Sequence, residues 1–151
     1  MRVYRLHRTH RSASDYSGSL LYPGRWHPRG TPILYFSLAL SLACLEQLVH
    51  LAPNEVPADY AFTTVEVSIQ PEIADFRGSL EDVDSTRRYG HRWATDQGSL
   101  TILVPSLIIP VEFNLLVNPL HPAFAELVWS APQPFAFDPR LLTRTAGLSK
   151  F

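Results

Sequence analysis

Three polar residues stand where the surrounding sequence is apolar, and such residues are candidates for chemistry. Arg5 lies inside a short apolar run, Glu46 lies in a leucine-rich stretch, and Ser106 directly follows the apolar run 102–105. A buried carboxylate destabilises a protein unless it is paired, so Glu46 is expected either to face a cleft or to meet an arginine. Its place at the edge of the leucine stripe fits a cleft-facing and a solvent-facing side chain equally well.

A second cluster brings a guanidinium, an indole and an imidazole together in Gly24-Arg25-Trp26-His27, ahead of Gly30. Glycine lets the backbone approach a ligand closely, and arginine binds phosphate or carboxylate through paired hydrogen bonds. We therefore expect Arg25 to bind an anionic ligand. Trp26 is expected to fill the core, while Tyr22 is a candidate for stacking on a flat ring.

Basic residues are distributed unevenly along the chain, although the formal net charge is -1. Six arginines fall within the first thirty positions, where Asp15 is the only acid, and from position 31 onward 7 basic residues face 13 acidic ones. A codon preference for arginine explains why Lys150 is the only lysine, but it does not explain the clustering. Binding to nucleic acid would need a broader positive surface, and the basic segment keeps that alternative open.

Length and motifs exclude several other classes. The 151 residues are the size of one domain with one core, taken as 1–151 with the tail from about 143 loosely attached. Polar residues interrupt the longest apolar run, 33–51, so no membrane span is expected, and the start of the chain does not resemble a signal peptide. The lone Cys44 rules out a disulfide framework and favours a cytoplasmic protein. No metal-ligand spacing, P-loop, GxGxxG or GxSxG motif occurs, so no metal site is expected.

The elements that would position these groups follow from hydrophobic periodicity and from the 13 prolines, which favour many short elements. The clearest helix is expected from Ser37 to about Leu51, where Pro53 stops it. A short helix is expected at 82–93, and 121–128 is expected to form a short helix or a strand. Strands are expected at 3–6, 32–36, 62–69, 100–104, 111–117 and 135–137, and a loop at 12–30. This order predicts the α+β class.

Seven segments carry a resemblance to a known family through their order and spacing. They are Tyr4-Arg5-Leu6, Gly24-Arg25-Trp26-His27 with Gly30, Ile33-Leu34-Tyr35, Ala43–Glu46 with His50, Val104-Pro105-Ser106, Asn118-Pro119 with His121-Pro122, and Phe137-Asp138-Pro139-Arg140-Leu141. Together they resemble the RES domain family over positions 3 to about 142. The family is named for an arginine, a glutamate and a serine, which here would be Arg5, Glu46 and Ser106. Two positions depart from its usual pattern, Pro23 in place of glycine and His27 in place of asparagine, and both are expected to alter ligand approach.

The resemblance implies a single compact α+β domain similar to ADP-ribosyltransferase toxins, with small mixed sheets, a few helices and NAD held in a cleft between sheets. It implies the toxin of a type II toxin–antitoxin pair, neutralised by an Xre-type helix-turn-helix antitoxin. Such a toxin would deplete cellular NAD by hydrolysis or phosphorolysis of the nicotinamide–ribose bond. NAD would then be the substrate, with no further cofactor.

The resemblance also assigns roles to individual side chains. The residues implied as catalytic are Glu46, Arg5 and Ser106, and those implied to bind NAD are Arg25, Tyr35, Tyr22 and Asn118. Glu46 would stabilise an oxocarbenium-like ribose, and the two arginines would bind the pyrophosphate or the adjacent ribose. The tyrosines would flank the nicotinamide ring, Asn118 would orient the substrate, and Ser106 would hydrogen-bond nicotinamide or ribose, since without a base it is a poor nucleophile.

Two alternatives stand beside this interpretation. One is a mono-ADP-ribosyltransferase, which would label a protein as NAD is lost. The other is a catalytically weak module that only binds a nucleotide or the antitoxin, and the release of free nicotinamide from NAD separates it from both enzymes.

Overall fold

The computed structural model describes residues 1–52 and 56–142, so the tail expected from about 143 lies outside the described residues. The strands are β1 (Arg2–Arg8), β2 (Leu34–Ser37), β3 (Tyr60–Glu66), β4 (Glu72–Ile73), β5 (Thr101–Pro105), β6 (Phe113–Val117), β7 (Val128–Trp129) and β8 (Gln133–Phe135). The helices are α1 (Ser17–Leu21), α2 (Leu40–Leu48), α3 (Val83–Asp96) and α4 (Pro139–Leu142), with a 3-10 helix η1 (Pro122–Glu126). The predicted α+β class is confirmed.

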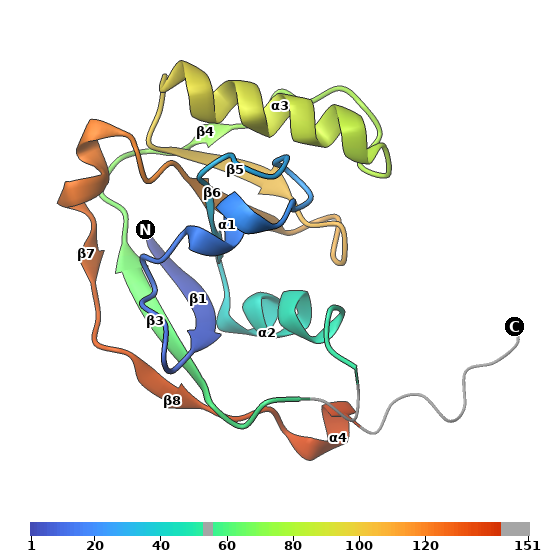
Figure 1. Ribbon diagram of the computed structural model, residues 1–151, viewed down its shortest axis with the longest axis vertical. Helices are drawn as coiled ribbons and strands as arrows, with labels where there is room; N and C mark the ends of the chain where they lie inside the picture. Colours follow the sequence, from blue (N-terminus) through green and yellow to red (C-terminus); the bar gives the residue numbers. More distant parts are fainter. Residues whose placement is uncertain (53–55, 143–151) are drawn as a thin grey trace, which may run out of the picture.

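All eight strands belong to one mixed sheet with two distinct halves. Its order is β4-β5-β6-β2-β1-β3-β7, with β8 also paired to β3. The halves meet at β1 and β2, where the register consists of Tyr4 opposite Ser37, whereas β1 pairs with β3 along its whole length. We call β4-β5-β6-β2 the upper half and β1-β3-β7-β8 the lower half, as they lie in Figure 1. The small sheets expected from the resemblance are thus joined by a narrow junction.

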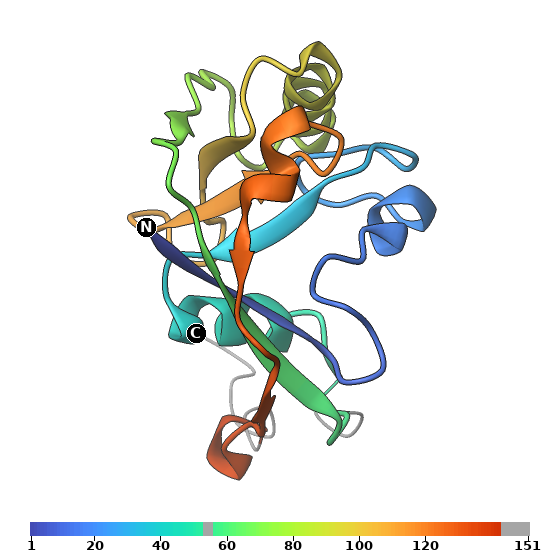
Figure 2. The ribbon, with the colours of Figure 1, turned by 90° about the vertical axis from the view of Figure 1, so that its left-hand side faces the viewer.

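The two longer helices pack against different strands of this sheet, α3 against β5 and α2 against β1 and β2. Figure 2 shows α3 at the top of the molecule and α2 lower down, above β8 and α4. Trp93 and Ala94 of α3 pack against Ile102 of β5, and Ala43 of α2 packs against Leu6 of β1. Helix α3 therefore covers the upper half, and α2 covers the junction strands β1 and β2.

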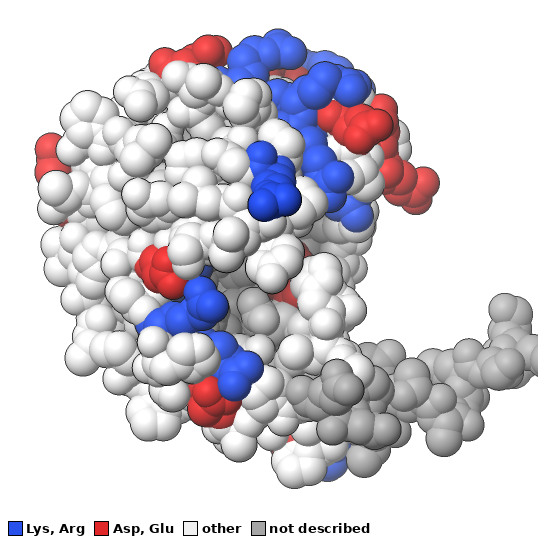
Figure 3. All heavy atoms as spheres, viewed as in Figure 1, with Lys and Arg blue, Asp and Glu red and all other residues white. Residues whose placement is uncertain are grey.

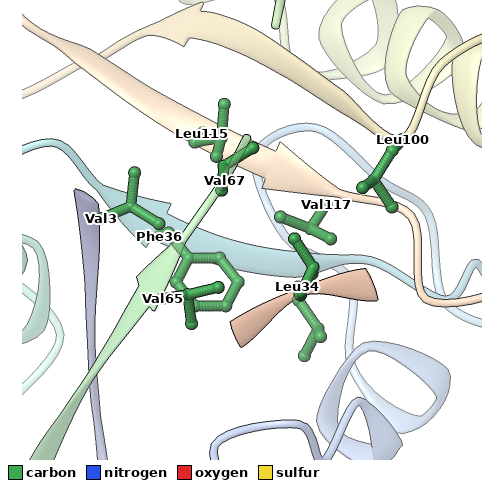
Figure 4. Close-up of a cluster of buried hydrophobic side chains, with 9 residues drawn as sticks. Val3, Leu34, Phe36, Val65, Val67, Leu100, Leu115 and Val117 are labelled. Atoms are coloured by element: carbon green, nitrogen blue, oxygen red, sulfur yellow. The ribbon is translucent and has the colours of Figure 1, made fainter. Parts of the chain in front are cut away.

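A central apolar cluster surrounds Phe36. The buried side chains that surround it in Figure 4 include Val3, Leu34, Val65, Val67, Leu100, Leu115 and Val117. They come from strands of both halves, so burying them holds the halves together at their narrow junction. The alternation predicted for 62–69 is confirmed at Val65 and Val67, but Ile69 is 44% exposed because β3 already ends at Glu66.

Other boundaries differ from prediction for identifiable reasons. Helix α2 begins at Leu40 because Ser37 instead pairs with Asn114 in the β2–β6 ladder. The predicted helix at 82–93 is confirmed as α3, whose first turn is capped by the Asp82 carboxylate accepting from the Ser85 backbone N–H. The expected loop at 12–30 contains the five-residue helix α1. Within the described residues, no helix combines the length and apolar character needed to cross a membrane.

Candidate active site

A cleft of about 680 Å³ opens where the two halves of the sheet meet. Its walls come from β1, from α1 and the loop after it, from β2, α2 and the start of α3, and from the turn after β5. Figure 3 shows the molecule hollowed on this face, with Lys and Arg side chains above and below the hollow. Five of the seven site residues implied by the resemblance line the cleft, namely Arg5, Tyr22, Arg25, Tyr35 and Glu46.

Glu46 reaches the cleft from the middle of α2 and is held by one of its two carboxylate oxygens. Its Oε1 accepts hydrogen bonds from Ser106 Oγ at 2.9 Å and from Asn114 Nδ2 at 2.5 Å. No residue that the structure describes donates a hydrogen bond to Oε2, and Glu46 lines the cleft. The two hydrogen bonds to Oε1 orient the carboxylate, and Oε2 remains available to accept a hydrogen bond from a ligand. Of the two placements open from the sequence, the structure shows the cleft-facing one.

Ser106 supports Glu46 and is not among the described residues that line the cleft. Its hydroxyl donates to Glu46 and accepts from the backbone N–H groups of Ile108 and Ile109 at 3.1 and 3.0 Å. The side chain is almost completely buried, so its hydrogen-bonding capacity is already used inside the protein. In this structure Ser106 orients Glu46, whereas the resemblance implied a direct contact to nicotinamide or ribose.

Asn114 on β6 is a site residue that the sequence analysis missed. A carboxylate only accepts hydrogen bonds, so the Asn114 amide must turn its NH2 group toward Glu46 and its Oδ1 toward Ser37. Ser37 Oγ donates to that Oδ1 at 2.7 Å. Asn114, Ser37, Ser106 and Glu46 form a connected polar group that we call the carboxylate end of the cleft. The signal in the sequence was a single amide in the apolar segment 113–117, a position typical of a satisfied core residue as well.

Arg5 projects from β1 and does not form an ion pair with Glu46. Its guanidinium donates to the carbonyls of Ala13 and Asp15 at 2.7 and 3.0 Å and lies 5.9 Å from the ring centroid of Phe36. Burial lowers the pKa of Arg5 to about 10, partly offset by the charge of Asp15. Arg5 therefore remains a cation at neutral pH and fixes the segment before α1 against β1.

Arg25 and Arg87 form a second charged region, which we call the arginine wall. Both line the cleft, Arg25 from the loop after α1 and Arg87 from the second turn of α3. Arg25 Nη1 donates to Leu80 O at 3.2 Å, and Arg87 Nε donates to Gly24 O at 2.9 Å. Arg87 could not be singled out from the sequence, because nothing local separates it from the neighbouring Arg88.

Helix α3 contacts three successive backbone carbonyls of the loop that carries Arg25. Besides the bond from Arg87 to Gly24 O, the Thr86 hydroxyl donates to Arg25 O at 2.7 Å. Gly90 lies against the third carbonyl so closely that a Cβ there would come within 1.8 Å of Trp26 O. Trp26 is 3% exposed and packs edge-on against aromatic rings, as predicted for a core residue.

Tyr35 and His27 are joined in a hydrogen-bonded row behind the loop. Tyr35 Oη accepts from the Trp26 N–H at 3.1 Å and lies 2.7 Å from His27 Nδ1, while His27 Nε2 lies 3.1 Å from Tyr22 O. Because the Tyr22 carbonyl only accepts, His27 carries its proton on Nε2, and Tyr35 donates to Nδ1. The phenol hydrogen is thus directed at His27, which leaves the ring of Tyr35 as its contribution to the cleft.

Burial disfavours the charged forms of both Tyr35 and His27. It raises the pKa of Tyr35 and lowers the pKa of His27, to which the nearby positive charge of Arg87 also contributes. Both groups are therefore neutral at neutral pH, as the hydrogen-bond directions require. His27, one of the two departures from the family pattern, fixes the rotamer of Tyr35. Tyr22 is 72% exposed at the mouth of the cleft.

Asn118, implied as an NAD ligand, is not brought to the cleft. Its Nδ2 donates to Ala94 O at 2.8 Å and its Oδ1 accepts from the Leu120 N–H at 3.0 Å. The side chain is completely buried, so it links the end of α3 to the turn after β6. The described residues contain no group of three or more His, Cys, Asp or Glu placed to hold a metal ion.

Comparison with known proteins finds one family model and several relatives that are named as toxins. The model of the RES domain matches residues 2–138. The protein "Toxin Res" of Yersinia enterocolitica is 33% identical, over 93% of this chain and 99% of that protein. The "Prs ADP-ribosylating toxin" of a Sphingobium species is 32% identical, over 85% and 86% of the two chains. A chain of the M. tuberculosis MbcT–MbcA toxin–antitoxin complex shares the fold, with a TM-score of 0.72 at 18% identity over 93% of this chain and 86% of that chain.

Proposed function

The chain belongs to the RES domain family, and we propose that it is the toxin of a toxin–antitoxin pair that depletes NAD by breaking the nicotinamide–ribose bond. The observation that carries the proposal is the carboxylate end: Glu46 lines the cleft with Oε1 fixed by Ser106 and Asn114, and no described residue donates to Oε2. Relatives named as toxins, one of them ADP-ribosylating, support this choice.

The proposed reaction needs a negative charge at the ribose and no acid at the leaving group. The C1–N bond breaks with its electron pair going to the pyridinium nitrogen, so nicotinamide leaves neutral and the ribose becomes an oxocarbenium-like cation. Glu46 Oε2 stabilises that cation and accepts a hydrogen bond from a ribose hydroxyl. Water then adds at C1 and releases a proton, giving ADP-ribose, or phosphate adds and gives its 1-phosphate.

The rest of the cleft holds the two ends of the dinucleotide. Arg25, at the arginine wall, binds the pyrophosphate, and Arg5, which also lines the cleft, adds a further positive charge. The ring of Tyr35, held by His27, and the exposed ring of Tyr22 flank nicotinamide. Asn114 holds the carboxylate of Glu46 in place through its hydrogen bond to Oε1.

A second candidate function shares the first chemical step and differs in the acceptor. The Sphingobium relative, which is 32% identical, is named as ADP-ribosylating, and a protein side chain could replace water or phosphate at C1. Whether the acceptor is small or macromolecular decides between the two functions.

The proposed partner is an Xre-type helix-turn-helix antitoxin that neutralises the toxin. The solved structure that shares this fold is a toxin–antitoxin complex. A small helix-turn-helix protein encoded beside this gene is expected to co-purify with the chain and to suppress its NAD consumption. Lack of both effects would contradict this assignment.

Product analysis with NAD labelled in the adenosine half tests the function and its alternatives. The purified chain is incubated with labelled NAD, with and without inorganic phosphate, and with and without a cell extract. We expect free nicotinamide together with labelled ADP-ribose or its 1-phosphate. Label on a protein of the extract would identify an ADP-ribosyltransferase. Binding of NAD without nicotinamide release under any condition would leave only the binding module and overturn the proposal.

A further inference from the structure

Arg87 combines a fixed position at the cleft with unused hydrogen-bonding capacity. Its Nε donates to Gly24 O at 2.9 Å, and its two terminal nitrogens have no hydrogen-bond partner among the described residues. No carboxylate of the described residues lies within ion-pair distance of Arg87 or of Arg25. Four other arginines, Arg2, Arg8, Arg11 and Arg140, do pair with acids.

The bond to Gly24 sets the plane of the Arg87 guanidinium. Because the group is planar and delocalised, fixing Nε restricts where the terminal nitrogens point. Arg87 is only half-buried and lines the cleft, so these nitrogens are available to a ligand. A preoriented pair of N–H groups without a carboxylate partner suits bidentate binding of a phosphate oxygen pair.

Arg25 presents a second guanidinium from the same wall. One of its nitrogens donates to Leu80 O, and Thr86, the residue before Arg87, holds the Arg25 carbonyl. Helix α3 thus positions both arginines, one through its own side chain and one through the loop backbone. The positive charges of both arginines also act on Tyr35, where they oppose the rise in its pKa that burial causes.

We propose that Arg87 and Arg25 together form the binding site for the pyrophosphate of a dinucleotide substrate, with the two terminal nitrogens of Arg87 as bidentate donors to it. The inference rests on the proposed function for the identity of the substrate. It goes beyond that function by assigning a residue of α3 to the part of NAD that does not react. Anchoring a remote group binds substrate and transition state equally, so loss of Arg87 raises KM and leaves kcat nearly unchanged.

Arg87→Gln tests this assignment, with Arg88→Gln as the matched control. Arg88 is the next residue of the same helix and is exposed, and among the described residues it hydrogen-bonds only to the Ser85 hydroxyl. Both variants therefore remove one positive charge from α3. For Arg87→Gln we expect KM for NAD to rise about tenfold to a hundredfold, the range for losing hydrogen bonds to a charged group. The Kd for ADP, measured by calorimetry, should rise by the same factor, with kcat and Tm little changed. Arg88→Gln should change none of these.

The two readouts distinguish failure of this inference from failure of the proposed function. If the wild-type chain cleaves NAD but Arg87→Gln leaves KM and ADP affinity unchanged, the pyrophosphate site is wrong and the function stands. If the wild-type chain releases no nicotinamide but Arg87→Gln weakens ADP binding, the function is wrong and the site stands. Loss of kcat and Tm at unchanged ADP affinity would make Arg87 a structural residue and overturn the inference.

Discussion

The carboxylate end and the arginine wall face the same cleft but are built in opposite ways. Side chains 60 to 77 residues apart bond to one another at the carboxylate end, where Glu46, Ser106, Asn114 and Ser37 form a connected chain. At the arginine wall, each guanidinium bonds to one backbone carbonyl and retains further N–H groups. A reacting carboxylate requires a fixed direction, whereas an anion site requires donors that are still free. Under the proposed function, the carboxylate end would carry the chemistry and the arginine wall would bind the substrate.

Gly90→Ala should damage the arginine wall most, because the added Cβ would lie 1.8 Å from Trp26 O, a backbone atom. The loop and α3 must then separate, with a loss of unfolding free energy on the order of 3 kcal/mol and a higher KM for NAD. Gly98→Ala is the control, since nothing lies within 4 Å of its Cβ position. Chemical denaturation of both variants measures the effect, and equal stabilities would contradict the packing described for Gly90.

Asn114→Ala should damage the carboxylate end and leave the arginine wall intact. Glu46 then keeps only Ser106, and kcat should fall about 10- to 100-fold for a lost hydrogen bond to a charged group, with KM for NAD little changed. Ser37→Ala, which removes only the support of Asn114, should have a smaller effect in the same direction. Steady-state kinetics of nicotinamide release provide the measurement. A change confined to KM would show that Asn114 binds substrate and does not position Glu46.

The smallest expected effect concerns His27, which connects Tyr35 to the loop of the arginine wall. Its pKa is lowered in the folded state, so the unfolded chain binds the proton first as the pH falls. The contribution of His27 to stability is therefore complete above about pH 6.5 and is lost as the pH drops below that value. Between pH 7.5 and 5.5, Tm should fall more steeply for the wild type than for His27→Asn. Parallel Tm profiles would contradict a neutral His27 in the folded protein.

The sequence was sufficient for the parts of the fold that local pattern determines. Apolar periodicity located α2 and the strands 100–104 and 111–117 to within a few residues, and the stretch at 82–93 became α3. Helix α1 was not predicted, since it has no side-chain cap and no acidic residue in its first turn. The start of α2 was placed too early because the pairing of Ser37 with a distant strand overrides local helix preference.

The same distinction between local pattern and distant pairing applies to the candidate site. Glu46 and Arg25 stood out as charged residues in unusual surroundings, and both line the cleft. Their partners could not be predicted, because contacts such as Asn114 to Glu46 span 68 residues and depend on how strands pair. The resemblance pointed to Asn118 and not to Asn114, and only tertiary packing places Asn114 beside Glu46 and Asn118 against backbone groups.

The central claim is that Glu46 acts on the substrate and is not a structural residue. Glu46 bonds to Ser106 and Asn114 and forms no ion pair with Arg5, so Glu46→Gln should retain the fold. The most direct test compares nicotinamide release at saturating NAD for Glu46→Gln and for Glu126→Gln, an exposed control on η1. We predict that Glu46→Gln loses about 100- to 1,000-fold in kcat while its Tm stays close to that of the control. Equal rates of nicotinamide release from the two variants would contradict the proposed role of Glu46.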